Sequence, residues 1–372
     1  MQKHQPTNSV HRTMCLLYAL ITVLMLASCL KGSSREQYHS RTQFAMNTLC
    51  TVILYGEANP DVHTAVFARI DEIESRMNNF LPDSDISRIN AAAGIQPITV
   101  HEEVFFMIKR AKYFAEISGG AFDPTIGPLV SLWGVTTENP SVPESGEINN
   151  ALSFINWNDI TLDEEALTVF LNRRGMSLDL GAIAKGYAAD EAVALIKAAG
   201  VDRAIVDLGG NVFTVGMKDV QTQTPWNVGL RNPFQGKSPH IGIISGGDIT
   251  VVTSGVDQRY FEEGGVRYHH LFSPFDGYPA QNGLVSVTVT AAVSADADAL
   301  STAAFVLGYE KGSALIESYD GAEAIFVFDD KSIRKTSGAS FVLRDETFHL
   351  VSDEGSLPKV SFALFPFAQQ HL

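Results

Sequence analysis

Strand-like segments follow one another along the middle of the chain, with no regular alternation of strand and helix. β-Branched and apolar residues gather at 204–208, 226–230, 241–244 and 249–253, and Gly209-Gly210-Asn211 forms a tight turn after the first run. Parallel neighbours would each need a crossover connection, usually a helix. The spacing therefore favours antiparallel or mixed sheets with flanking helices over a doubly wound parallel sheet.

Helical periodicity marks the segments on either side of these strands. Apolar residues recur every three or four positions over 62–77, in a helix opened by Asn59-Pro60-Asp61. Thr99 and Glu102 form a capping-box pattern before a second helix that ends near Gly119-Gly120. The remaining predicted elements are a strand over 44–56, helices over 182–199 and 297–307, a half-buried strand over 285–290, and strands over 324–328 and 341–343. We therefore expect an α+β fold in a single large domain.

The first 28 residues have the pattern of a lipoprotein signal peptide. Lys3 and Arg12 give a weakly basic start, and the apolar run over 15–27 is too short for a membrane-spanning anchor. Leu26-Ala27-Ser28 precedes Cys29 in a lipobox pattern, which predicts lipidation of Cys29 as the first mature residue. The alternative is an uncleaved signal anchor with an incidental cysteine. The predicted boundaries are a signal peptide over 1–28, a tether over 29–43, a domain over 44–350 and a C-terminal tail over 351–372.

Charge and cysteine content restrict the chemistry. Loss of the signal peptide would take the net charge from −15 to −17, because Lys3 and Arg12 leave with it. Nucleic-acid binding needs clustered lysine and arginine, so nucleic acid is not an expected partner. With Cys15 in the signal peptide and Cys29 lipidated, Cys50 remains alone, and no disulfide can form within the mature chain. Cys50 lies in an apolar run and is expected to be a core residue.

One predicted helix begins in a way that suits an anion. Asp179 precedes Gly181-Ala182-Ile183-Ala184, and Lys185 follows one turn into the helix. Backbone amides at a helix start attract anions, and Lys185 adds a positive charge. The alternative is an ordinary capped helix with a solvated lysine. The chain lacks the glycine patterns of Rossmann and P-loop nucleotide sites, so neither of those mechanisms applies.

Asp298 and Thr302 are four residues apart and share one face of a predicted helix. A carboxylate and a hydroxyl so placed can bind a hard cation together. The alternative is that Thr302 bonds within its own helix while Asp298 is merely exposed, and Asp296 is a rival carboxylate on another face. A separate candidate is the loop that contains Asp123. Gly119-Gly120 lets the backbone approach a ligand closely and Pro124 holds Asp123 extended, although an ordinary connecting loop would look the same.

Four motifs occur in one order along the chain. They are Gly120-Ala121-Phe122-Asp123-Pro124-Thr125, Gly181-Ala182-Ile183-Ala184-Lys185-Gly186, Thr253-Ser254-Gly255 and Ala297-Asp298-Ala299-Leu300-Ser301-Thr302. Together they resemble the bacterial FAD:protein FMN transferases, which are periplasmic flavin-handling lipoproteins. The resemblance runs from about Met46 to about Val342. It implies the T-fold-like architecture of those transferases and a periplasmic protein anchored to a bacterial membrane through Cys29.

The resemblance also implies a ligand set. Asp298, Thr302 and the backbone carbonyl of Ala182 would hold Mg²⁺, and Phe80 would stack on a ring of FAD, the substrate. His270, in the stretch His269-His270-Leu271-Phe272-Ser273-Pro274, would act as the base, with Asp298 and Lys185 as the other catalytic groups. A surface histidine pair is the alternative. The residues implied to bind FAD are Met46, Phe80, Ala121, Phe122, Asp123, Asp179, Lys185, Ser254 and Phe272.

Several positions depart from the family's pattern. Ser273 stands where the family usually has an aspartate, Val256-Asp257 replaces an Asp-Tyr pair, and Asn47 replaces a glycine in Met46-Asn47-Thr48. These changes put in doubt which acceptor receives FMN. Binding of FAD and of a metal ion is still expected despite these changes.

Three functions remain open at this point. The first is Mg²⁺-dependent transfer of FMN from FAD to a Ser or Thr of a protein, with release of AMP. Its acceptor would carry the motif Asp-x-x-Ser/Thr-Gly-Ala-Ser/Thr, as subunits of redox-driven ion pumps do. The second is an FAD pyrophosphatase, in which water attacks in the same site. The third is a non-catalytic flavin-binding lipoprotein, which would have no need for Asp298, Thr302 and His270 together.

Overall fold

The computed structural model describes residues 37–57, 60–234, 236 and 238–351. The predicted signal peptide, Cys29 and the tail from residue 352 lie outside these residues, so the boundaries at 28, 43 and 350 stay predictions. From His39 onward the described chain belongs to one compact unit of mixed sheets and helices, which is the α+β class expected. Among the described helices, none combines the length and the apolar character needed to cross a membrane.

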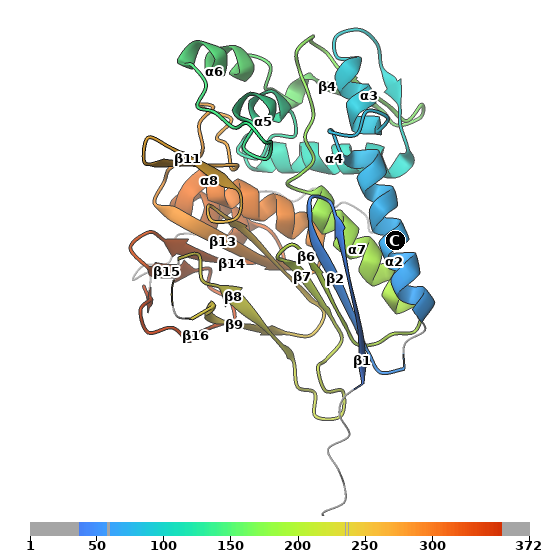
Figure 1. Cartoon of the computed structure of the whole chain (residues 1–372), viewed down its shortest axis with the longest axis vertical. Helices are drawn as coiled ribbons and strands as arrows, with labels where there is room; N and C mark the ends of the chain where they lie inside the picture. The colour runs from blue at the N-terminus through green and yellow to red at the C-terminus, as the bar shows by residue number, and fades with distance from the viewer. Residues whose placement is uncertain (1–36, 58–59, 235, 237, 352–372) are drawn as a thin grey trace, which may run out of the picture. The chain divides into compact units, whose positions relative to one another are not determined.

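A nine-stranded sheet runs through the centre of this unit (Figure 1). Neighbouring strands from β2 to β15 are antiparallel, and β17 adds to the edge in parallel with β15. In spatial order the strands are β1 (Tyr38–Ala45), β2 (Thr48–Tyr55), β6 (Ala204–Leu208), β7 (Asn211–Val215), β10 (Ile249–Gly255), β13 (Leu284–Ala291), β14 (Glu323–Phe328), β15 (Ser332–Lys335) and β17 (His349–Leu350).

The single strand predicted over 44–56 is wrong, because a turn divides it. Met46 and Asn47 have φ of 51° and 58°, which places both in the left-handed region and separates β1 from β2. Consecutive left-handed residues are typical of the tight turns that join neighbouring strands. Asparagine tolerates this conformation better than most residues, which explains how Asn47 can replace a glycine.

Three helices cover one face of the large sheet: α2 (Pro60–Met77), α7 (Ala184–Ala198) and α8 (Ser294–Ser318). α7 packs on β6 and β7, α8 packs on β10, β13 and β14, and α2 packs beside α7. Gly308 interrupts α8 with φ 74°, and the side-chain amide of Asn282 donates to the Phe305 carbonyl at the interruption. The last turns of α8 therefore leave the axis of the first.

A second sheet covers the opposite face of the large one. Its strands are β8 (Trp226–Arg231), β9 (His240–Gly246) and β16 (Phe341–Leu343), all antiparallel. The large sheet therefore has a hydrophobic core on each face. Two successive residues of β14 show this: Phe326 packs in the core under the helices, and Ile325 packs in the core between the two sheets. The half-buried strand predicted over 285–290 is therefore wrong in its exposure, because β13 is covered on both faces.

The remaining elements lie outside these two sheets. They are α3 (Asp85–Ala91), β3 (Ile98–Thr99), α4 (Glu102–Ile117), α5 (Gly127–Trp133), α6 (Ser145–Leu152), the short η1 (Trp157–Asp159), β4 (Ile160–Asp163), β5 (Thr168–Leu171), β11 (Tyr260–Glu263) and β12 (Val266–His269). The predicted capping box is wrong. Thr99 belongs to β3 and pairs with Thr168 of β5, and the N-cap of α4 is His101, whose side chain makes no capping hydrogen bond. The buried Asp85 carboxylate accepts from the His101 amide instead, at 2.8 Å.

Candidate functional site

Lys185 and Asp298, 113 residues apart in the chain, meet at the start of α7. The Lys185 ammonium lies 3.3 Å from Asp298 Oδ2 and donates to the Gly181 carbonyl at 2.7 Å. The Gly186 amide also donates to Asp298 Oδ2, at 3.1 Å. The lysine is thus held by the protein, so the alternative of a solvated lysine is wrong.

Gly186 lets α7 and α8 approach each other. A Cβ at this position would lie 2.3 Å from the Ser294 carbonyl oxygen and 2.6 Å from the Ala295 amide nitrogen. The Asp190 carboxylate accepts from the amides of Ser294 and Ala295 at 2.8 and 2.9 Å, which fastens the start of α8 to α7. These contacts hold Lys185 opposite Asp298.

Asp298 and Thr302 both lie in α8, where their spacing of four residues puts them on one face of the helix, as the sequence predicts. Asp298 is only 4% exposed, so the alternative of a merely exposed carboxylate is wrong. The Thr302 hydroxyl lies 3.3 Å from Ser254 Oγ, and Ser254 Oγ lies 2.8 Å from Ser301 Oγ. The structure thus brings Ser254 of β10 to the helix face that carries Asp298 and Thr302.

The rival carboxylate, Asp296, has a structural role. Both of its oxygens accept from the Arg110 guanidinium, and the Tyr319 hydroxyl donates to it at 2.7 Å. These partners hold Asp296 away from Lys185 and satisfy its charge.

The predicted metal ligands offer oxygen atoms only: the Asp298 carboxylate, the Thr302 hydroxyl and the Ala182 carbonyl. Asp298 Oδ1 is 3.5 Å from Lys185 Nζ, a weak contact that leaves this oxygen able to take a further ligand. No three His, Cys, Asp or Glu side chains cluster as a metal site within the described ranges. One carboxylate with neutral oxygens fits a hard cation such as Mg²⁺, whereas zinc selects nitrogen and sulfur ligands.

Asp179 joins three segments in front of α7. Its Oδ1 accepts from the Gly181 amide at 2.7 Å, and its Oδ2 accepts from the Asn79 side chain at 3.1 Å. The Asp179 amide donates to the Pro124 carbonyl at 2.9 Å. Phe80 follows Asn79 and is 60% exposed, so its ring is available for stacking on a ligand beside these segments.

The carboxylate of Asp123 organises its own loop. Oδ1 accepts from the amide and hydroxyl of Thr125, and Oδ2 accepts from the Trp157 amide. Burial raises the pKa of Asp123 above its ordinary value, against these hydrogen bonds. The side chain of Phe122 is also buried, in edge contact with Phe114, so the backbone is the part of this loop that can reach a ligand.

His270 is a neutral base with a defined tautomer. Its Nδ1 lies 3.1 Å from the Arg259 carbonyl oxygen, and because a carbonyl only accepts, Nδ1 carries the hydrogen. Nε2 is therefore unprotonated and can accept a proton. Burial lowers the pKa of His270 to about 3, and the Arg259 charge contributes in the same direction.

The adjacent histidine, His269, is buried in the core, so at most one of the pair can address the site. His269 Nε2 donates to the Ala280 carbonyl and its Nδ1 accepts from the Leu271 amide, both at 3.2 Å. Burial lowers the pKa of His269 to about 4.

The Phe272 side chain is turned away from the site. Its ring centroid lies 5.7 Å from that of Trp133, so only the backbone of Phe272 can face a flavin. Ser273 Oγ accepts from the Phe275 amide within a turn.

The turn at Met46-Asn47 is bonded to two other segments through its backbone. The Met46 amide donates to Glu74 at 2.8 Å, and the next carbonyl, of Asn47, accepts from the Arg259 guanidinium at 3.1 Å. Arg259 was missed by the sequence analysis. A single arginine in a loop between two strands carries no pattern, and only the fold brings it to His270.

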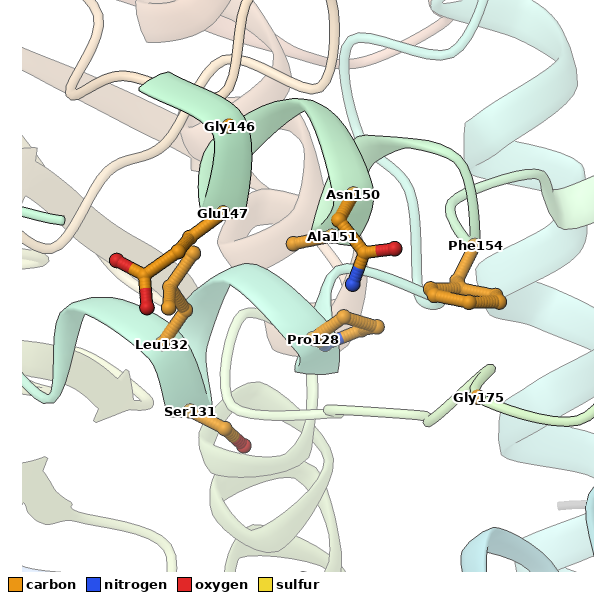
Figure 2. A pocket seen from close by; sticks show the side chains of 9 residues that line it. All are labelled: Pro128, Ser131, Leu132, Gly146, Glu147, Asn150, Ala151, Phe154 and Gly175. Atoms are coloured by element: carbon orange, nitrogen blue, oxygen red, sulfur yellow. The ribbon is translucent and has the colours of Figure 1, made fainter. Parts of the chain in front are cut away.

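A separate pocket of about 580 Å³ lies between α5 and α6 (Figure 2). Pro128 of α5 faces Asn150 of α6, Leu132 lies beside Glu147, and Phe154 lies at one end. None of the residues predicted to bind FAD or metal lines it. The pocket therefore does not locate the chemistry.

The arrangement at α7 suits chemistry on phosphate. The positive end of a helix dipole and a lysine attract phosphate oxygens, and a neutral histidine with a free nitrogen can remove a proton from an attacking group. Such a combination is typical of enzymes that act on phosphate esters and anhydrides.

The chain belongs to the ApbE family, whose sequence pattern it matches over residues 46–326. A protein of Treponema pallidum named FAD:protein FMN transferase is 40% identical over 335 residues, covering 86% of this chain and 92% of the relative. A Klebsiella pneumoniae protein of the same name is 40% identical over 268 residues, covering 72% of this chain and 82% of the relative.

Solved structures of this family share the fold. The ApbE protein of Thermotoga maritima has a TM-score of 0.74 at 33% identity, covering 81% of this chain and 97% of its own. The flavin transferase ApbE of Vibrio cholerae has a TM-score of 0.71 at 25% identity, covering 84% and 98%. The predictions of an α+β fold and of an enzyme of this family are confirmed; the T-fold label stays a prediction.

Proposed function

We propose that this chain transfers FMN from FAD to a Ser or Thr hydroxyl of a target protein, in a Mg²⁺-dependent reaction that releases AMP. The observation that carries the proposal is the meeting of Lys185, Asp298 and the start of α7. The family relationship supports FAD as the flavin donor and a protein as the acceptor.

The pyrophosphate of FAD would bind where positive charge is concentrated. The positive end of the α7 dipole and the Lys185 ammonium would attract phosphate oxygens, and Asp298 keeps the ammonium in place at 3.3 Å. Phe80, exposed beside Asn79, would stack on a ring of FAD.

Asp298, Thr302 and the Ala182 carbonyl would hold Mg²⁺. When bound, this ion would neutralise the charge that develops on the leaving phosphate. Lys185 would bind the pyrophosphate from its place at the helix start.

His270 would act as the general base. The acceptor hydroxyl would lose its proton to Nε2 while Nδ1–H stays bonded to the Arg259 carbonyl. Because the pKa of His270 is lowered to about 3, the ring is neutral at physiological pH and its Nε2 lone pair is free.

Water is the alternative nucleophile in the same site. Its attack would make the chain an FAD pyrophosphatase that yields free FMN and AMP. The same base and the same pyrophosphate contacts serve both reactions, so the acceptor decides between them.

The proposed setting is the periplasm, with the chain anchored to a membrane by lipid on Cys29. The lipobox pattern Leu26-Ala27-Ser28-Cys29 supports this location. The proposed partner is a protein with the motif Asp-x-x-Ser/Thr-Gly-Ala-Ser/Thr, such as a subunit of a redox-driven ion pump.

One experiment tests the proposal directly. The protein is incubated with FAD and Mg²⁺, with a peptide bearing the acceptor motif or with the same peptide carrying Ala at the Ser/Thr positions. Transfer predicts AMP together with a peptide heavier by one FMN unit, only with the hydroxyl-bearing peptide. AMP with free FMN in every reaction would support the pyrophosphatase, and no AMP at all would refute both.

Binding of the substrate is measured separately. Calorimetry should give a Kd for FAD in the micromolar range or tighter, about −8 kcal/mol or better. A folded protein that binds no FAD would refute the pocket built from Phe80, Asp179 and Lys185.

A further inference from the structure

Arg259 is a half-buried cation without a carboxylate partner. It lies between β10 and β11, and among the described residues its side chain has one hydrogen-bond acceptor, the Asn47 carbonyl at 3.1 Å. No described carboxylate lies within ion-pair distance of it. Arg69 and Arg76, also half-buried, both pair with Glu103.

An unpaired guanidinium in such a place is costly. Burial of a charge is compensated by a counter-charge and by hydrogen bonds, and a guanidinium offers five donors. Burial lowers the pKa of Arg259, while the more distant Asp179 and Asp298 act in the opposite direction. These carboxylates belong to the site at the start of α7, so Arg259 faces the same region.

We propose that Arg259 is a catalytic residue whose guanidinium binds the flavin-side phosphate of FAD, the phosphate that the acceptor attacks. This inference rests on the proposed function. In the step, the acceptor oxygen forms a bond to the flavin-side phosphorus and its proton passes to His270 Nε2. The bond from that phosphorus to the bridging oxygen breaks, and AMP leaves with the electron pair.

The connection to His270 identifies the phosphate. The Arg259 carbonyl accepts from both the backbone amide of His270 at 3.2 Å and its Nδ1 at 3.1 Å. A general base must lie within hydrogen-bond reach of the attacking hydroxyl, and that hydroxyl lies against the attacked phosphorus. The guanidinium on the same residue is therefore placed for the oxygens of that phosphate, and its paired donors suit two of them.

The same charge acts on the base. Arg259, together with His269 and Lys185, lowers the pKa of His270 in addition to the effect of burial. Loss of the guanidinium should therefore raise the pKa of His270. The His270 pKa therefore reports whether the guanidinium charge reaches the base, which gives the test a readout besides turnover.

The test compares three variants of the full chain. Arg259→Gln removes the charge, Arg259→Lys keeps the charge but not the paired donors, and Arg267→Gln removes a guanidinium from β12 that pairs with Glu262. AMP release from FAD gives kcat and KM. NMR of ¹³C-labelled histidine, assigned with a His270→Gln spectrum, gives the His270 titration without FAD.

We expect Arg259→Gln to lower kcat at least 100-fold and to raise the pKa of His270. Arg259→Lys should lower kcat about 10-fold, because a lysine cannot make the two parallel hydrogen bonds that a guanidinium makes to phosphate. The same variant keeps the positive charge and should therefore leave the pKa of His270 near its wild-type value. Arg267→Gln should keep the wild-type kcat and the wild-type His270 titration.

Each contrary result has one meaning. Wild-type protein that releases no AMP would refute the proposed function, whatever the variants do. Active wild-type protein with an equally active Arg259→Gln variant would overturn only the inference. A lower kcat with an unchanged His270 pKa would mean a structural role and would also overturn it. If Arg259→Gln does not fold, a wild-type kcat in Arg259→Lys would overturn the proposed contact.

Discussion

Asp298 connects the two helices of the site through a single carboxylate. The same oxygen accepts from the Gly186 amide and faces the Lys185 ammonium, while its residue lies almost fully buried. A buried carboxylate with two such partners holds its position, and loss of it leaves the lysine without a counter-charge. At the scale of single residues, the site depends most on this side chain.

Asp298→Ala should lower AMP release from FAD at least 100-fold, equivalent to about 2.7 kcal/mol of barrier. FAD affinity should fall much less, because Phe80 and the backbone contacts are unchanged. EDTA should reproduce the loss, and added Mg²⁺ should restore only the EDTA-treated protein. Asp320→Ala, at an exposed position, is the control. Full activity in both EDTA and Asp298→Ala would contradict a metal mechanism.

The two neighbouring histidines give a prediction for pH. Folding lowers the pKa of His269 to about 4 and of His270 to about 3, from an ordinary value of about 6.5. Neutral imidazoles thus stabilise the fold above about pH 6.5, and this contribution is lost as the pH falls toward the folded values. The acid limb of AMP release should likewise lie below about pH 5.

His269→Gln supplies the comparison. This variant should lose less stability than the wild type between about pH 6.5 and pH 4, measured by urea unfolding. Parallel losses in both proteins, or an acid limb near pH 6.5, would show that the histidines titrate normally in the folded chain.

At the scale of elements, the contact between α7 and α8 places the site. Gly186 and Asp190 lie one turn apart on α7 and both address the start of α8. α8 in turn presents Asp298 on its first turns, before the interruption at Gly308. The geometry at Lys185 therefore depends on how closely the two helices pack.

Gly186→Ala should lower the stability of the protein by about 1–3 kcal/mol, because the added methyl group meets the backbone of Ser294 and Ala295. The matched control is Gly146→Ala in α6, where a Cβ meets nothing within 4 Å, and it should stay within about 1 kcal/mol of the wild type. Urea unfolding measures both. Equal stability of the two variants would mean that the helices can separate at little cost.

Sequence patterns over a few neighbouring residues correctly predicted several helices and strands, because tertiary packing does not alter these elements. The periodic helix over 62–77 and the strand at 204–208 are where the sequence placed them. The capping box at Thr99 and the exposure of 285–290 were wrong, because strand pairing and a second sheet decide them. Asp298 and Thr302 follow from spacing on one helix, whereas Arg259 reaches the site only through a loop, which no periodicity reports.

At the scale of the whole molecule, the described residues from His39 onward form one compact unit. The residues of the site come from both halves of that unit, from Met46 to Thr302. The lipobox pattern at Cys29 predicts a second property, attachment to a membrane, which would be independent of the fold.

Cys29→Ala should abolish lipidation and leave the precursor unprocessed. In a bacterial host, the wild type should follow the membrane fraction and incorporate labelled palmitate, and the variant should do neither. Cys50→Ala is the control, since Cys50 is buried and its pKa is raised to about 11, which makes it inert. A native protein that keeps its first residue and carries no lipid would refute the lipoprotein assignment.

The long separation between Lys185 and Asp298 has a consequence for biosynthesis. A ribosome-bound chain that has reached α7 already contains Lys185, but the helix start still lacks the carboxylate that completes it. The missing partner is synthesised 113 residues later, after most of the central sheet. A growing chain therefore lacks the complete arrangement at the start of α7 until Asp298 has been synthesised and α8 has packed on α7.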